Sequence, residues 1–111
     1  MKLAIVGSRN LHITNLEHYI TADVTEIVSG GAKGIDSCAR VFATSKGIPL
    51  KEFLPDYNKY GRSAPIIRNK EIVDYSDAVL TFWNGNSKGT KSVIDYCKKQ
   101  DKPVRIVIIN A

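Results

Sequence analysis

Cysteine is scarce in this chain, and long apolar runs are missing. The two cysteines, Cys38 and Cys97, have neither CxxC spacing nor a neighbouring histidine. We therefore expect buried reduced thiols, not a disulfide or a metal site. No stretch approaches the roughly 18 apolar residues of a membrane span. The opening "MKLAIVGSRN" reaches Gly7 and Arg9 too early for a secretory signal, so we expect a cytoplasmic protein without a membrane partner.

Histidine is also rare. His12 and His18 have no carboxylate or cysteine partner at metal-ligand spacing, and we expect both histidines to be exposed or partly buried. No Ser-His-Asp or Cys-His arrangement can be read from the sequence. The sequence therefore predicts no metal, no cofactor and no catalytic nucleophile of the hydrolase type.

Acidic residues are fewer than basic ones, which gives a formal net charge of +5 and a pI near 9.3. Such an excess suggests an anionic partner. Part of the excess has another explanation, because Lys98, Lys99 and Lys102 surround an expected helix end, where cations suit the helix dipole or a solvated face. Lys88 and Lys91 differ, since they lie in a glycine-rich turn.

Apolar periodicity divides the chain into strands that alternate with helices. The expected strands cover residues 3–6, 25–29, 49–54, 77–83 and 103–109. The expected helices cover residues 15–20, 34–47, a segment starting at Pro65, and 90–100. Strands joined by helices predict an α/β, Rossmann-like three-layer sandwich, with a five-stranded, mainly parallel sheet and helices on both faces. The length of 111 residues suits one domain, residues 1–111.

Glycine-rich loops follow the first, second and fourth expected strands. They read "GSRN", "GGAKGID" and "NGNSKGTKS". Because the carboxyl ends of parallel strands share one edge, all three loops should meet there, where such sheets bind ligands. Bare backbone at helix starts can hold a phosphate, and Arg9, Lys33, Lys88 and Lys91 would add charge. The alternative is that the glycines and polar residues only form turns and caps.

Standard nucleotide motifs do not match these loops. "GGAKG" lacks the GxGxxG spacing, and no acidic residue follows where a ribose hydroxyl would need it. "GNSKGTKS" resembles GxxxxGK[ST], but Gly85 and Gly89 are one residue too close and Thr90 comes before Lys91. A dinucleotide dehydrogenase and a P-loop phosphotransferase are therefore disfavoured.

Four segments in order along the chain resemble the signature segments of the SLOG superfamily. They are "VGSRN" (6–10), "SGGAKGID" (29–36), "RNKEI" (68–72) and "SKGT" (87–90). The superfamily joins the Smf/DprA DNA-processing proteins with the LOG phosphoribohydrolases, and this chain looks closest to the small stand-alone, YAcAr-like members met in phage and bacterial genomes. The resemblance implies a Rossmann-like domain that binds nucleotides, nucleotide-derived signals or single-stranded DNA at the loop edge.

The resemblance assigns ligand contacts to the same loops. Gly7, Ser8 and Arg9 would border the base or ribose side, the floor would be Ser29, Gly30, Gly31, Ala32, Lys33 and Gly34, and Ser87, Gly89 and Thr90 would hold phosphate beside Lys88. Arg68 and Asn69 would be further ligand contacts. Asp36 either stabilises its helix start or bonds the nearby loops. Of Phe82 and Trp83, one should be core and the other, Trp83, could stack on a base; Tyr57 and Tyr60 are similar candidates.

We predict a protein that senses or sequesters a small nucleotide-derived ligand of the ADP-ribose or cyclic nucleotide type. The first alternative is N-glycosidic hydrolysis of a nucleotide, and the second is weak single-stranded DNA binding. The hydrolase relatives carry a glutamate where this chain has Val93, and Asp95 should point away from the ligand. We also expect a homo-oligomer, because Phe42, Ile66 and Ile67 suggest exposed apolar helix faces.

Overall fold

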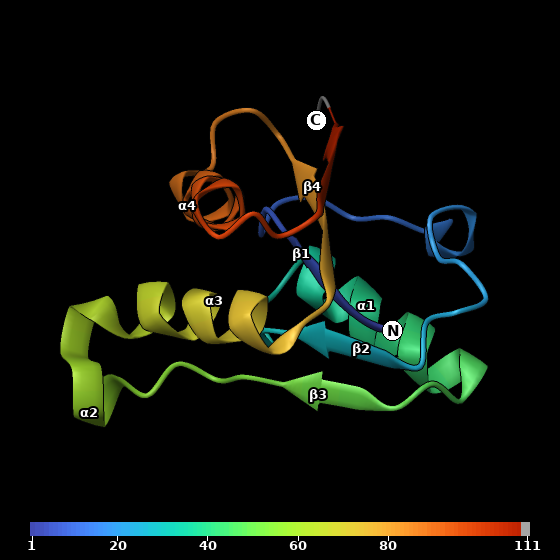
Figure 1. Ribbon diagram of the computed structural model, residues 1–111, viewed down its shortest axis with the longest axis horizontal. Coiled ribbons are helices and arrows are strands. Elements are labelled where there is room, and N and C mark those ends of the chain that lie inside the picture. The colour runs from blue at the N-terminus through green and yellow to red at the C-terminus, as the bar shows by residue number, and fades with distance from the viewer. Residues whose placement is uncertain (110–111) are drawn as a thin grey trace.

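Five parallel strands form one sheet in the order β3-β2-β1-β4-β5 (Figure 1). The computed structural model describes residues 1–109. The strands are β1 (Lys2–Gly7), β2 (Glu26–Ser29), β3 (Leu50–Glu52), β4 (Ala78–Trp83) and β5 (Val104–Ile108). From β1 the chain builds outward to β3 and then returns to the other side of β1. The strand order therefore reverses between β1 and β4, which is where open parallel sheets bind ligands.

Helices cover both faces of the sheet, as predicted. The α-helices are α1 (Ile35–Lys46), α2 (Tyr57–Tyr60), α3 (Ala64–Tyr75) and α4 (Lys88–Lys99), and the 3-10 turns are η1 (Leu16–His18) and η2 (Gly61–Ser63). The helix α1 packs on one face, and α3 and α4 pack together on the other (Figure 1). The expected α/β, Rossmann-like fold is confirmed, with a sheet that is parallel throughout.

The alternation of side chains along β1 builds the two halves of the core. Leu3 and Ile5 are buried with residues of α1, while Ala4 and Val6 are buried with residues of α3 and α4. Successive side chains of a strand point to opposite faces, so a strand covered on both sides has to be apolar at every position. This requirement explains the short continuous apolar run at the start of the sequence.

The helix expected over residues 15–20 is wrong, because the chain forms only the one-turn η1 there. Asn15 makes no side-chain cap, and Leu16 is the one residue of the turn that is buried. A single buried anchor supports a turn but not a longer amphipathic helix. The segment instead crosses the end of the core as an irregular connection between β1 and β2.

Other boundaries shift by a few residues. The third and fifth strands are shorter than expected, and the loop before α3 contains the short α2, which Asp56 caps through the Lys59 N–H. The fourth helix begins at Lys88, two residues before residue 90, because the Ser87 hydroxyl accepts a hydrogen bond from the Thr90 N–H at 3.3 Å. Such a cap satisfies an N–H that has no partner inside the helix.

Both cysteines are buried free thiols, as predicted, and they lie on opposite faces of the sheet. Burial raises the pKa of the Cys97 thiol to about 11, although the charge of Lys102 works in the other direction. Both histidines are exposed, in agreement with the sequence. Among residues 1–109, no three His, Cys, Asp or Glu side chains gather as a metal site.

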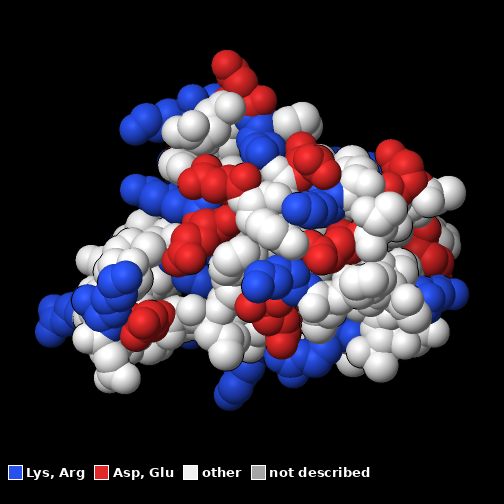
Figure 2. Space-filling view, turned by 60° about the horizontal axis from the view of Figure 1, so that its bottom comes forward, with Lys and Arg blue, Asp and Glu red and all other residues white. Residues whose placement is uncertain are grey.

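Charged side chains of both signs are interspersed on the face shown in Figure 2. The excess of basic residues therefore does not form a single-sign surface on that face.

Of the apolar residues expected to be exposed, Ile66 is half exposed, while Phe42 and Ile67 are partly buried. Within the described part of the chain, none of the helices combines the length and apolarity needed to cross a bilayer.

Candidate functional site

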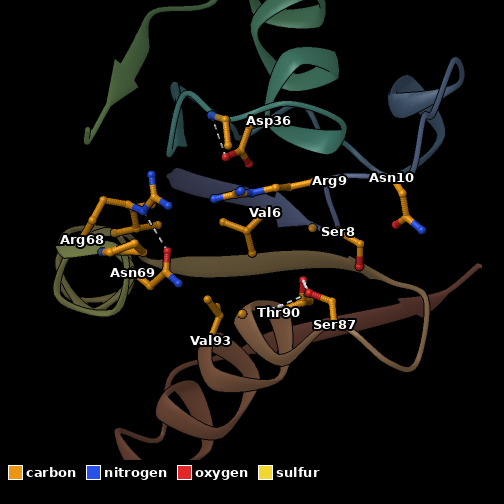
Figure 3. A pocket seen from close by; sticks show the side chains of 15 residues that line it. Val6, Ser8, Arg9, Asn10, Asp36, Arg68, Asn69, Ser87, Thr90 and Val93 are labelled. Carbon is orange, nitrogen blue, oxygen red and sulfur yellow. Dashed lines mark hydrogen bonds between the residues drawn. The ribbon is translucent and has the colours of Figure 1, made fainter. Parts of the chain in front are cut away.

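A cavity of about 420 Å³ lies at the carboxyl edge of the sheet, where the strand order reverses (Figure 3). Its walls come from the loop after β1, the start of α1, α3 and the first turns of α4. The lining residues are Val6, Gly7, Ser8, Arg9, Asn10, Ala32, Asp36, Pro65, Arg68, Asn69, Ile72, Ser87, Gly89, Thr90 and Val93. The fold thus brings the three predicted loops together around one space.

Close packing at Gly7 and hydrogen bonds of Ser8 fix the position of the loop after β1. A Cβ on Gly7 would lie 2.5 Å from Cγ1 of Ile35 and 2.6 Å from the Phe82 carbonyl oxygen, so only glycine fits. The Ser8 N–H donates to that same carbonyl at 3.1 Å, and the Ser8 hydroxyl accepts from the Asn84 N–H at 3.3 Å. These contacts fix the backbone, while the exposed Arg9 side chain extends along the cavity (Figure 3).

Asp36 organises the loop after β2. Its carboxylate accepts a hydrogen bond from the Ala32 N–H at 3.1 Å, and the Ser29 hydroxyl faces it outside ordinary hydrogen-bond geometry. Burial raises the pKa of the Asp36 carboxyl, against the opposing effects of the Ala32 N–H and the Arg68 charge. Of the two roles that the sequence left open, the loop-bonding one is observed, and Asp36 also lines the cavity.

Asp36 gives a testable pH dependence. The folded state keeps the Asp36 proton to higher pH than the unfolded chain, so this carboxyl lowers stability as pH rises above about 4. Asp36→Asn removes that dependence. In urea unfolding between pH 3 and pH 7, the variant should gain stability relative to the parent as the pH rises. A difference in unfolding free energy that stays constant with pH would contradict the prediction.

Arg68 reaches from α3 to the loop after β2. Its guanidinium is buried and donates to the Gly30 carbonyl oxygen at 2.7 Å, while its Nε donates to Oδ1 of Asn69 at 2.8 Å. Burial lowers the pKa of Arg68, and the nearby charge of Asp36 opposes that shift. A Cβ on Gly30 would lie 2.7 Å from Nη1 of Arg68 and 3.0 Å from Oδ2 of Asp36. Glycine at position 30 therefore makes room for both charged groups.

The start of α4 forms the opposite wall of the cavity (Figure 3). Oδ1 of Asn84 accepts from the N–H groups of Asn86 and Ser87, at 2.8 Å each, which turns the chain into the helix. The Thr90 hydroxyl donates to the Ser87 hydroxyl at 3.2 Å. Both hydroxyls line the cavity beside the first N–H groups of the helix, where the helix dipole favours an anion.

Apolar side chains form the floor between these polar walls. Val6, Ile72 and Val93 are buried and contribute to the lining. At position 93, where the resemblance noted in the sequence would imply a carboxylate, this chain presents the apolar Val93 to the cavity. Asp95 is exposed and pairs with Lys91 at 2.8 Å, and it does not line the cavity.

Some lining residues were not predicted from the sequence. The alternation of side chains along β1 could have indicated Val6. The positions of Ile72, Pro65 and Asn10 depend on how α3 and the first loop pack.

A second hollow of about 300 Å³ adjoins the first and shares Arg9, Ala32 and Arg68 with it. Gly30, Gly31 and Lys33 line this smaller space together with Leu54 and Pro55. The predicted glycine loop is therefore divided between two neighbouring hollows. The two arginines stand at the boundary, with the exposed Lys33 on the outer side.

Seven residues that the sequence put forward as ligand contacts or candidates line neither hollow: Ser29, Gly34, Tyr57, Tyr60, Trp83, Lys88 and Lys91. Ser29 is completely buried below the loop, and Lys88 is exposed on the first residue of α4. Phe82 is core, as predicted for one of the two aromatics. Trp83 donates from Nε1 to the Ser87 carbonyl oxygen at 3.0 Å. Its place is therefore behind the α4 loop, as a support for that loop.

In comparisons with protein-family models, curated proteins and solved structures, none matches this chain. The SLOG resemblance accordingly stays a prediction from the sequence.

Proposed function

We propose that the protein binds a small nucleotide or nucleotide-derived ligand, of the ADP-ribose or cyclic nucleotide type, and acts as a sensor or sequestering protein. The observation that carries this proposal is the convergence of three loops, an arginine and a capped helix start around one cavity with an apolar floor. Its volume of about 420 Å³ lies within the range of small-molecule sites.

The polar walls of the cavity suit the phosphate of a nucleotide, and its apolar floor suits the base or sugar. A phosphate fits between Arg9 and the Ser87–Thr90 turn, where a guanidinium and helix N–H groups favour negative charge. The apolar floor suits the face of a base or sugar. The adjoining hollow, with Arg9, Arg68 and Lys33 and no carboxylate among its lining residues, suits a second phosphate. Ligands with two phosphates should therefore bind more tightly than mononucleotides.

Binding is favoured over N-glycosidic hydrolysis by the chemistry of the floor. A valine at position 93 cannot stabilise positive charge on a ribose as the bond to the base breaks. The Asp36 carboxylate is buried and engaged with the Ala32 N–H. Single-stranded DNA is the weaker alternative, because affinity that rests on phosphate contacts needs many cations, whereas the basic residues lining the two hollows are Arg9, Arg68 and Lys33.

Calorimetry with AMP, 3′,5′-cyclic AMP, ADP-ribose and inorganic phosphate tests the proposal. Thr90→Val removes a hydroxyl at nearly constant side-chain size, and Arg9→Gln removes the positive charge, so each should weaken binding about ten- to a hundredfold. Lys98→Gln is the matched control at the far end of α4, and it should bind as the parent does. Unchanged affinity in both cavity variants would place the ligand elsewhere.

A further inference from the structure

A separate cavity of about 460 Å³ lies between the segment after β1 and the outer part of α1. It shares no lining residue with the two hollows described above. Its apolar walls include Ile13, Leu16, Val41 and Phe42. Val41 is 68% exposed, so the cavity opens to the surface beside it.

A cysteine and a histidine meet in this cavity. Sγ of Cys38 lies 3.3 Å from Nδ1 of His12, and the Ile13 N–H donates to the same sulfur at 3.4 Å. These two residues are 26 positions apart, so the pairing cannot be read from the sequence and only the fold brings them together. An imidazole beside a thiol is the pairing that activates a sulfur nucleophile.

Cys97 provides a contrast within the same chain. It is completely buried, lines none of the cavities described above, and has a pKa raised to about 11 by burial. Cys38 instead lines an open cavity next to a base. Both thiols are free and buried. We nevertheless expect Cys38 to be much more reactive than Cys97.

We propose that Cys38 and His12 form a second, reactive site, at which the thiol takes an acyl group from a small acyl thioester. His12 accepts the Sγ proton as Sγ bonds to the carbonyl carbon of the thioester. The bond from that carbon to the original sulfur then breaks, and His12 returns the proton to the departing thiolate. The products are Cys38 carrying the acyl group as a thioester and one free thiol. The apolar walls of the cavity would hold the acyl chain.

The experiment incubates the folded chain with acetyl and hexanoyl thioesters of N-acetylcysteamine and follows intact mass, peptide mass and released thiol. We expect one acyl group per chain on Cys38 and an equal amount of free thiol. The hexanoyl compound should react at least tenfold faster, because each buried CH₂ contributes about 0.8 kcal/mol. Cys38→Ser should abolish the reaction, Cys97→Ser should leave it unchanged, and His12→Asn should slow it at least tenfold.

Thermal unfolding shows whether each variant is folded. If Cys38→Ser does not fold, the acylation rate of His12→Asn tests the proposal. Equal labelling of Cys97, labelling of Cys38 only after denaturation, or an unchanged rate in His12→Asn would each overturn the proposal. Equal rates for the two chain lengths would overturn the role of the apolar walls. None of these outcomes depends on nucleotide binding at the other site.

Discussion

Gly34→Ala should destabilise the protein by about 3 kcal/mol or more and disorder the loop that carries Arg9. Gly34 precedes α1 with φ 73° and ψ −123°, a backbone region that costs an L-residue about 1–3 kcal/mol. The new Cβ would also collide with backbone, since it would lie 2.7 Å from the Ser8 carbonyl oxygen and against the Arg9 carbonyl. Overpacking of this kind adds about 1–3 kcal/mol.

Gly61→Ala is the matched control for the backbone strain. Gly61 has φ 56° and ψ −131°, close to the values at Gly34, but nothing lies within 4 Å of a Cβ built there. Thermal and urea unfolding of both variants separate strain from collision. Gly34→Ala should be the less stable of the two by at least about 1 kcal/mol, or about 4–8 °C in melting temperature. Equal losses would mean that the Arg9 loop moves aside without cost.

Arg68→Met should destabilise the fold by about 3 kcal/mol and abolish ligand binding at the proposed site. Methionine fills much of the same space but donates no hydrogen bond to the Gly30 carbonyl oxygen. It also leaves the buried Asp36 carboxylate without the nearby positive charge. Leaving a buried carbonyl oxygen without its charged donor costs about 1–3 kcal/mol, and loss of the nearby positive charge at Asp36 adds to that cost.

A double-mutant cycle with Asp36→Asn checks this explanation. If the cost arises from the unpaired carboxylate, Arg68→Met combined with Asp36→Asn should recover part of the stability lost in Arg68→Met alone. Lys70→Met, at an exposed position two residues along the same helix, should change stability little. Strict additivity of Arg68→Met and Asp36→Asn would show that the two side chains do not interact.

The position of the cavity follows from local patterns in the sequence. Short apolar runs between amphipathic segments predict parallel strands, and the carboxyl ends of such strands share one edge. The loops that carry Ser8, Ala32 and Thr90 were therefore expected to meet, and they line one cavity. Periodicity could not place Trp83 in the same way: its indole N–H donates to the Ser87 carbonyl oxygen, and it lines neither hollow.

By itself, the sequence determined the parallel α/β architecture, the edge at which the loops gather and the burial of both cysteines, because each depends on the spacing of apolar residues along a strand or helix. Only the tertiary structure decided that Arg68 bonds the Gly30 carbonyl across 38 positions, and that His12 lies against Cys38. Periodicity tells which way a side chain faces. Its partners depend on the packing distance between elements far apart in the chain.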